Sequence, residues 1–91
     1  MIDQEELTTL REAVAIAETP DAKAEALNNL ASHLNRILLR DDEALLVAQE
    51  ALQVAREAGN TLEEGNAYVR IGTISKNQGE NNKALDSYQQ A

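Results

Sequence analysis

Apolar residues recur at every third or fourth position along nearly the whole chain, which is the spacing of one face of an α-helix. They form five stripes. In chain order these are Leu7, Leu10, Ala13, Val14 and Ala17; Leu27, Leu30, Ala31, Leu34 and either Ile37 or Leu38; Ala44, Leu45, Ala48, Ala51, Leu52 and Ala55; Ala67, Tyr68, Ile71, Gly72 and Ser75; and Ala84, Leu85, Tyr88 and Ala91. No run alternates with period two, as a half-buried strand would. The pattern therefore predicts an all-α protein with five helices.

Residues that start and stop helices separate these stripes. Thr19 has the chemistry of an N-cap, and Pro20 suits the first position of the helix that follows. Gly59 stands just beyond the third stripe, where a glycine commonly ends a helix. Thr61 and Glu64 have the spacing of a capping box for the fourth helix.

The stripes also repeat along the chain. Residues 25–31 superpose on residues 66–72 at a shift of 41, and Ala44-Leu45 superposes on Ala84-Leu85 at a shift of 40. A fixed period of this size indicates stacked helical hairpins. We therefore interpret residues 1–91 as a single domain. It comprises a lone helix at 3–18, a first full repeat at 21–58 and a second repeat at 61–91.

The last of these segments resembles a known repeat. From Gly65 to Ala91 the chain is similar to a tetratricopeptide repeat of the longer, 40-residue bacterial subgroup. The residues that carry the resemblance are Tyr68 at the large aromatic position, Ile71 and Gly72 as the apolar–small pair, Gly79 at the turn, and Ala84, Tyr88 and Ala91 in the second helix. The earlier repeat departs from the motif, with Ala31 in place of the small glycine and Leu38 in place of the turn glycine. The resemblance implies a right-handed α-solenoid of antiparallel helix hairpins. The first helix of each hairpin would then line a concave groove for a partner.

Charge and composition exclude several classes of function. The chain has 16 acidic and 8 basic residues, a net charge of −8, which disfavours nucleic-acid backbones and anionic membranes as partners. No cysteine is available for disulfides, thiolate chemistry or most structural zinc sites. The first residues do not resemble a signal peptide, and no apolar run approaches the ~20 residues that span a bilayer. We therefore expect a cytoplasmic protein.

Residues that could carry chemistry are few and scattered. His33 is the only histidine, and we expect it to be solvated or partly packed rather than a base or a metal ligand. Asp41, Asp42 and Glu43 form an acidic cluster that a helix N-terminus explains. The glycines are isolated, so no phosphate-cradling loop is present. The sequence predicts neither an enzyme nor a cofactor or metal site.

A binding surface is the better candidate for function. The side of the second and fourth helices that faces away from their apolar stripes is polar and mildly basic, and it would face the groove. Its residues are Asn28, Ser32, Asn35, Arg36, Asn66, Val69, Arg70, Thr73, Lys76 and Asn77. Amide and hydroxyl side chains can bond the backbone of an extended peptide, and the basic residues favour an acidic or C-terminal peptide. We expect a protein-interaction module within a scaffold or regulatory protein, the alternative being that these are ordinary solvated residues.

A second alternative is self-association. The repeat pattern stops within the fifth helix, which indicates either a piece of a longer protein or a short chain that covers its own open end. In the latter case Leu85 and Tyr88 would form the contact of a homodimer, and the chain would be a structural oligomerisation unit without a peptide ligand.

Overall fold

A computed structural model describes residues 2–79, 87, 89 and 90. Across this part of the chain there are four helices and no strand. The helices are α1 (Ile2–Ile16), α2 (Pro20–Arg36), α3 (Asp41–Ala58) and α4 (Thr61–Asn77). The all-helical prediction is confirmed, but the prediction of a five-helix solenoid is wrong, since the described residues form four helices. The expected fifth helix, with Leu85 and Tyr88, lies outside the described residues.

Two helix boundaries follow directly from the residues that stand there. Thr19 has an extended backbone, and its hydroxyl oxygen accepts a hydrogen bond from the Ala22 amide at 3.1 Å, so it caps α2 as predicted. Gly59 ends α3 in the left-handed region, with φ at 67°. The Asn60 amide then donates to the Ala55 carbonyl at 2.9 Å, which satisfies one of the last carbonyls of the helix.

The cap of α4 is one residue earlier than predicted. The side-chain oxygen of Asn60 accepts from the Glu63 amide at 3.0 Å, and Thr61 is already the first helical residue. The other end of the Asn60 amide donates to an Asp21 carboxylate oxygen at 2.9 Å. The Asn60 side chain makes the two bonds with separate atoms, since its oxygen accepts and its nitrogen donates. The second bond ties the start of α4 to the start of α2.

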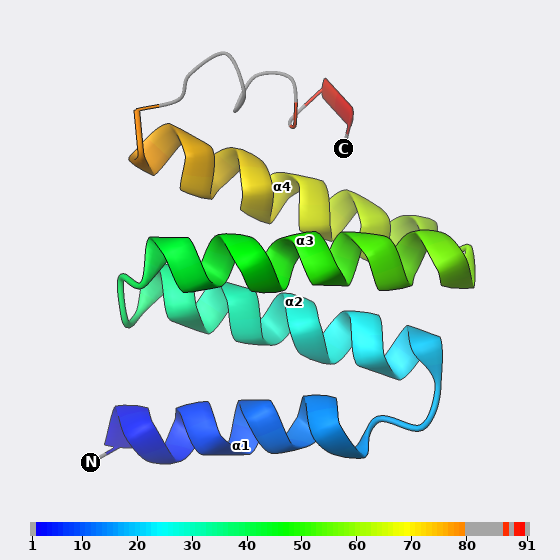
Figure 1. The fold of residues 1–91 in the computed structure, drawn as a ribbon, viewed down its shortest axis with the longest axis horizontal. Helices are drawn as coiled ribbons and strands as arrows, with labels where there is room; N and C mark the ends of the chain where they lie inside the picture. Colours follow the sequence, from blue (N-terminus) through cyan, green and yellow to red (C-terminus); the bar gives the residue numbers. More distant parts are fainter. Residues whose placement is uncertain (1, 80–86, 88, 91) are drawn as a thin grey trace.

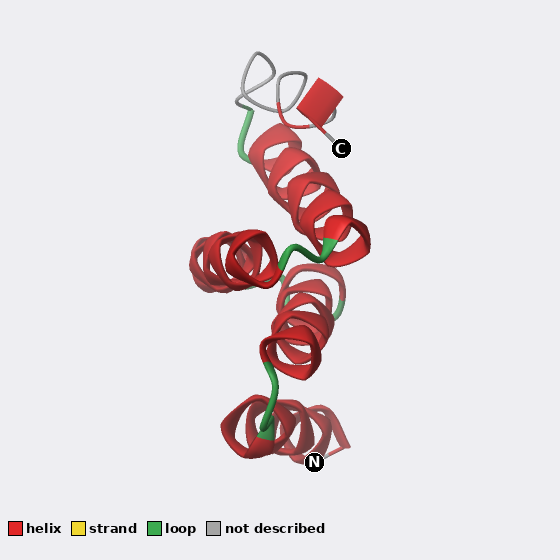
Figure 2. Ribbon diagram, turned by 90° about the vertical axis from the view of Figure 1, so that its right-hand side faces the viewer, coloured by secondary structure: helices red, strands yellow, loops and turns green. Residues whose placement is uncertain are grey.

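The helices are arranged around α2. Three of them lie one above another in the order α1, α2, α4, and α3 stands to one side of this column (Figures 1 and 2). α3 packs against both α2 and α4, α2 also packs against α4, and α1 packs against α2. α2 therefore has neighbours on three sides.

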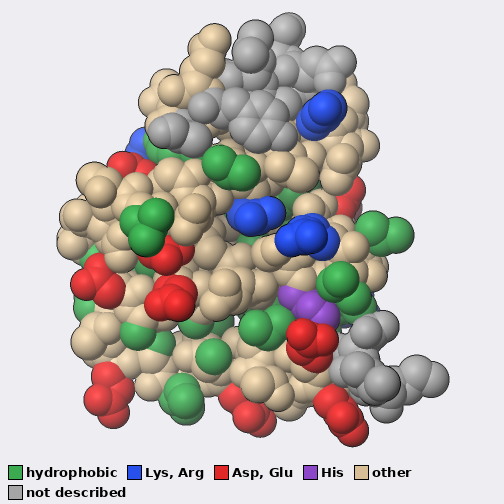
Figure 3. Space-filling model, turned by 180° about the vertical axis from the view of Figure 1, so that it is seen from behind, with side chains coloured by type: hydrophobic (Ala, Val, Ile, Leu, Met, Phe, Trp, Pro, Cys, Tyr) green, Lys and Arg blue, Asp and Glu red, His purple; other side chains and the backbone are tan. Residues whose placement is uncertain are grey.

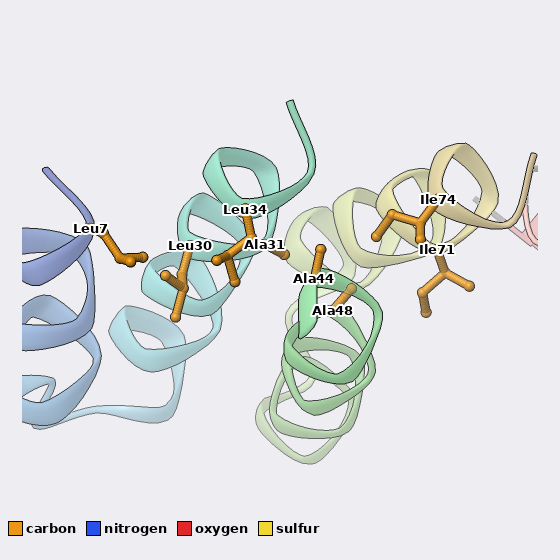
Figure 4. Close-up of a cluster of buried hydrophobic side chains, with 8 residues drawn as sticks. All are labelled: Leu7, Leu30, Ala31, Leu34, Ala44, Ala48, Ile71 and Ile74. Atoms are coloured by element: carbon orange, nitrogen blue, oxygen red, sulfur yellow. The ribbon is translucent and has the colours of Figure 1, made fainter. Parts of the chain in front are cut away.

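The core is built largely from small side chains. Those of α3 that are buried are all alanine, at a spacing of three and four residues: Ala44, Ala48, Ala51 and Ala55. A stripe of alanines lets α3 approach α2 and α4 closely, so that leucines and isoleucines of the neighbouring helices fill the space. Figure 4 shows the largest cluster, which contains Leu7, Leu30, Ala31, Leu34, Ala44, Ala48, Ile71 and Ile74.

The predicted stripes of the four helices are buried or partly buried, and at the end of α2 the structure selects Leu38 from the two residues that the sequence left open. Leu27, Leu30, Ala31 and Leu34 are all buried, but Ile37 is 56 % exposed. The helix ends at Arg36, so Ile37 no longer follows the helical spacing, and Leu38 packs against the core in its place.

The molecule is too thin to enclose a large site. Its shortest dimension is 15 Å, which spans the column of α1, α2 and α4 together with α3 beside it. Any partner therefore has to bind on a surface or in a groove between two helices.

Candidate functional site

The face opposite α3 is the candidate site. Figure 3 views the molecule from this side, where lysine and arginine side chains gather over α2 and α4. Eight of the predicted groove residues are wholly or partly exposed. They are Ser32, Arg36, Asn66, Val69, Arg70, Thr73, Lys76 and Asn77, and we call them the basic face.

The cations of this face differ from the other described cations in one respect. Elsewhere in the described residues each lysine or arginine has a carboxylate within 4.0 Å, in the pairs Arg11–Glu43, Lys23–Glu50, Arg40–Glu43 and Arg56–Glu64. Within the same part of the chain, Arg36, Arg70 and Lys76 have none. Three positive charges without a carboxylate partner among the described residues thus share one face of a protein whose net charge is −8. Such a face attracts an anionic partner.

Two predicted groove residues are not available to a partner. Asn28 is 5 % exposed, and its amide nitrogen donates to the Glu63 carbonyl at 3.0 Å and to the Glu63 carboxylate at 2.8 Å. Asn35 is 3 % exposed and donates to the Asp41 carboxylate at 3.1 Å. These two amides therefore hold α2 against α4 and against the start of α3. The prediction placed them in the groove because they lie off the apolar stripe, yet neighbours of α2 cover them.

Glu63 is a structural residue that the sequence analysis missed. It is 8 % exposed, and its carboxylate accepts from both Asn28 and Asn66, the latter at 3.3 Å. It lies in the first turn of α4, where the helix dipole favours an acidic side chain. An acidic residue at that position is typical of an exposed helix start, so the sequence does not indicate that Glu63 is buried. Its effect is to fix the seam between α2 and α4 beneath the basic face.

The acidic cluster of α3 is engaged in contacts with its surroundings. Asp41 accepts from Asn35, and Asp42 accepts from the side-chain amide of Gln78 at 2.9 Å. Glu43 pairs with Arg11 at 2.6 Å and with Arg40 at 3.8 Å. The cluster therefore links the start of α3 to α1, α2 and the end of α4. Among the described residues no group of three or more histidine and carboxylate side chains is placed to hold a metal ion.

His33 is more buried than predicted. It is 7 % exposed, and its Nε2 atom has no hydrogen-bond partner among the residues that the structure describes. The expectation of a solvated or partly packed imidazole is thus corrected, and the reason is again that α2 is enclosed by its neighbours.

None of the described helices is long and apolar enough to cross a membrane.

Comparison with known proteins adds no relative. No family model, no curated protein and no solved structure matches this chain. The resemblance to tetratricopeptide repeats therefore stays a prediction.

Proposed function

We propose that this chain is a protein-interaction module that binds an acidic peptide segment on the basic face. The observation that carries the proposal is a set of three cations on one side of α2 and α4, Arg36, Arg70 and Lys76, which have no carboxylate partner within the described part of the chain. Surface cations elsewhere in the described chain are already neutralised by nearby carboxylates. Those on the basic face can form ion pairs with a partner without first breaking internal ones.

The polar residues of the face suit a peptide backbone. Ser32, Asn66 and Asn77 offer hydroxyl and amide groups that both donate and accept hydrogen bonds. Val69 adds a partly buried apolar contact between them. A surface of this kind binds an extended segment through its main chain and selects it by charge.

The resemblance of residues 65–91 to a tetratricopeptide repeat supports the same proposal, because the first helix of such a repeat faces the ligand. In this chain that helix is α4, which carries Arg70 and Lys76. A self-association unit built on Leu85 and Tyr88 would rest on residues outside the described part of the chain.

The test compares two charge-matched triple variants. The first, Arg36→Gln/Arg70→Gln/Lys76→Gln, removes the cations of the basic face. The control, Arg11→Gln/Arg40→Gln/Arg56→Gln, removes the same amount of charge from paired positions. The probe is a panel of fluorescein-labelled, capped dodecapeptides with two to six acidic residues, and binding is followed by fluorescence anisotropy.

We expect the first variant to bind the panel at least about tenfold more weakly than the control in 0.15 M salt. At this ionic strength the Debye length is about 8 Å, so the salt largely screens the effect of the changed net charge that both variants share. Equal weakening by both variants would show that only the overall charge matters. Failure of the natural chain to bind any peptide of the panel would also contradict the proposal.

A further inference from the structure

An apolar hollow of about 410 Å³ lies between α1 and α2. Its aliphatic lining comes from Leu10, Ala13 and Ile16 of α1 and from Ala26 of α2. We call this hollow the α1–α2 groove. None of the residues that line it belongs to the basic face, so the two are separate surfaces.

The aliphatic side chains of the α1–α2 groove are in contact with water. Ile16 is 75 % exposed, and Leu10 and Ala13 are only partly buried. Among the described helices, α2 is the one that packs against α1, so no other described helix covers the groove. A partner that covers these side chains removes apolar surface from water, which favours binding.

Two carboxylates border the groove, and neither has a basic partner among the described residues. Glu18 and Glu25 both line the groove and are exposed. No lysine or arginine of the described chain lies within 4.0 Å of either carboxylate. The cations that precede Leu30 in the described chain are Arg11 and Lys23, and both pair with carboxylates of α3. The groove is therefore acidic as well as apolar.

The cations of the basic face do not neutralise these acids. Arg36 follows Glu25 by eleven residues along α2, which corresponds to about 16 Å. Both side chains are exposed, and the Debye length at physiological salt is about 8 Å, so the solvent largely screens one charge from the other. In Figure 3 the blue side chains lie over α2 and α4, whereas red and green ones gather over α1 at the bottom of the view. The groove thus attracts positive charge, and the basic face attracts negative charge.

The shape of the groove suits a helix. Within the core, α3 already packs against two helices at once, α2 and α4, through its stripe of alanines. The α1–α2 groove likewise presents alanines and branched side chains from two neighbouring helices. Its lining on α2 extends from Ala22 to Asn29, which is about 10 Å or two helical turns. A partner helix presents apolar side chains four positions apart on one face over such a length.

We propose that the α1–α2 groove docks an amphipathic helix of a partner protein. This helix carries two aliphatic residues four positions apart, with a lysine or arginine beside each. Its aliphatic side chains cover Leu10, Ala13 and Ile16, and its cations pair with Glu18 and Glu25. The proposal goes beyond the proposed function, because it gives the protein a second docking surface with the opposite charge.

The probe is a capped, alanine-rich peptide of about 15 residues, long enough to form a helix. It has two leucines four positions apart and a lysine beside each, and isothermal titration calorimetry gives its affinity for the natural chain. We expect the affinity to fall about tenfold when serine replaces both leucines, because the apolar contact is lost. It should fall about fivefold when glutamine replaces both lysines, because the ion pairs are lost.

One pair of variants tests the acids of the groove. Glu18→Gln/Glu25→Gln removes the carboxylates that line it, and the control Glu5→Gln/Glu12→Gln removes two exposed acids of α1 that do not. The two variants change the net charge equally. We expect the first to bind the lysine–leucine peptide about fivefold more weakly than the control.

A second pair tests the apolar contact. Ile16→Ala shortens an aliphatic side chain of the groove, and the control Leu46→Ala shortens one on α3 that does not line it. The two side chains are 75 % and 68 % exposed, so neither change disturbs the core. We expect Ile16→Ala to bind the peptide about fivefold more weakly than Leu46→Ala.

Three outcomes would overturn the proposal. The first is that the natural chain does not bind the peptide, or that each variant binds it as tightly as its control. The second concerns a peptide with a central proline, which breaks the helix; if this peptide binds as tightly, the occupant is not a helix. The third is that the free chain sediments as a dimer and Ile16→Asp as a monomer, because a second copy then occupies the groove. The proposed function is tested separately, with acidic peptides and with variants of the basic face.

Discussion

At the scale of single residues, Leu39 has a backbone conformation that is unfavourable for its side chain. It lies in the turn between α2 and α3 with φ at 55°, the only positive φ at a residue other than glycine in the described chain. Its side chain is 77 % exposed, so burial does not compensate. The left-handed conformation costs a residue with a β-carbon roughly 1–2 kcal/mol, and asparagine is among the few that adopt it readily.

We predict that Leu39→Asn makes the protein more stable than Leu39→Ala. Both changes remove the exposed leucine side chain, but only asparagine suits the left-handed backbone. The difference in the free energy of unfolding should be about 0.5–1 kcal/mol in favour of asparagine, measured by urea denaturation. If the alanine variant is equally stable or more so, the turn is not strained at this residue.

Some residue-scale features were predictable and others were not. Thr19 has a hydroxyl oxygen that can accept from a helix amide, and Gly59 lacks a β-carbon and adopts the left-handed region readily, so their positions at helix ends could be predicted directly. Asn60 and Thr61 are adjacent, and either residue type can cap a helix. The bond from Asn60 to Asp21 explains why Asn60 is the cap of α4. Nothing in the sequence indicates that a leucine adopts the left-handed conformation. The repeat motif predicted the turn at Leu38, one residue before Leu39.

At the scale of helices, the contact between α2 and α4 depends on a buried polar pair. Asn28 and Glu63 are both nearly covered, and the amide of Asn28 bonds both the carbonyl and the carboxylate of Glu63. Removing one partner of such a pair leaves the other buried without its bond, at a cost of about 1–3 kcal/mol or more for a charged group. Replacing both partners by apolar residues of similar size avoids that cost.

We therefore predict strong coupling in a double-mutant cycle. Asn28→Leu alone should destabilise the protein by about 2–3 kcal/mol, and the double variant Asn28→Leu/Glu63→Leu should recover at least about 1 kcal/mol of this loss. Urea unfolding of the four proteins measures the coupling. Additive losses would mean that the two side chains do not support one another across the α2–α4 seam.

The helices show why part of the candidate site was misplaced. An apolar stripe identifies the face that packs on one neighbour, but α2 has three neighbours. Asn28, Asn35 and His33 lie off its stripe and are covered all the same. On α4 the predicted groove residues stay wholly or partly accessible, namely Asn66, Val69, Arg70, Thr73, Lys76 and Asn77. The sequence could predict which residues form a polar face, but not which part of that face another helix covers.

At the scale of the whole molecule, the proposed binding surface depends on how the charges are distributed. The chain is strongly acidic, yet its unpaired cations all lie on α2 and α4 within the described residues, on the side that α3 leaves open (Figure 3). Composition alone gives only the net charge. Pairing depends on the arrangement of the helices, as when Glu43 of α3 reaches Arg11 of α1.

The most direct measurement is a map of where an acidic peptide binds. Uniformly ¹⁵N-labelled protein is titrated with the dodecapeptide of the panel that binds most tightly, and amide shifts are followed by NMR. We predict the largest shifts at Ser32, Arg36, Val69 and Lys76, on α2 and α4, while Gln49 and Gln53 on the exposed side of α3 stay unchanged. Shifts centred on α3, or spread evenly over the molecule, would contradict the assignment of the basic face as the binding surface.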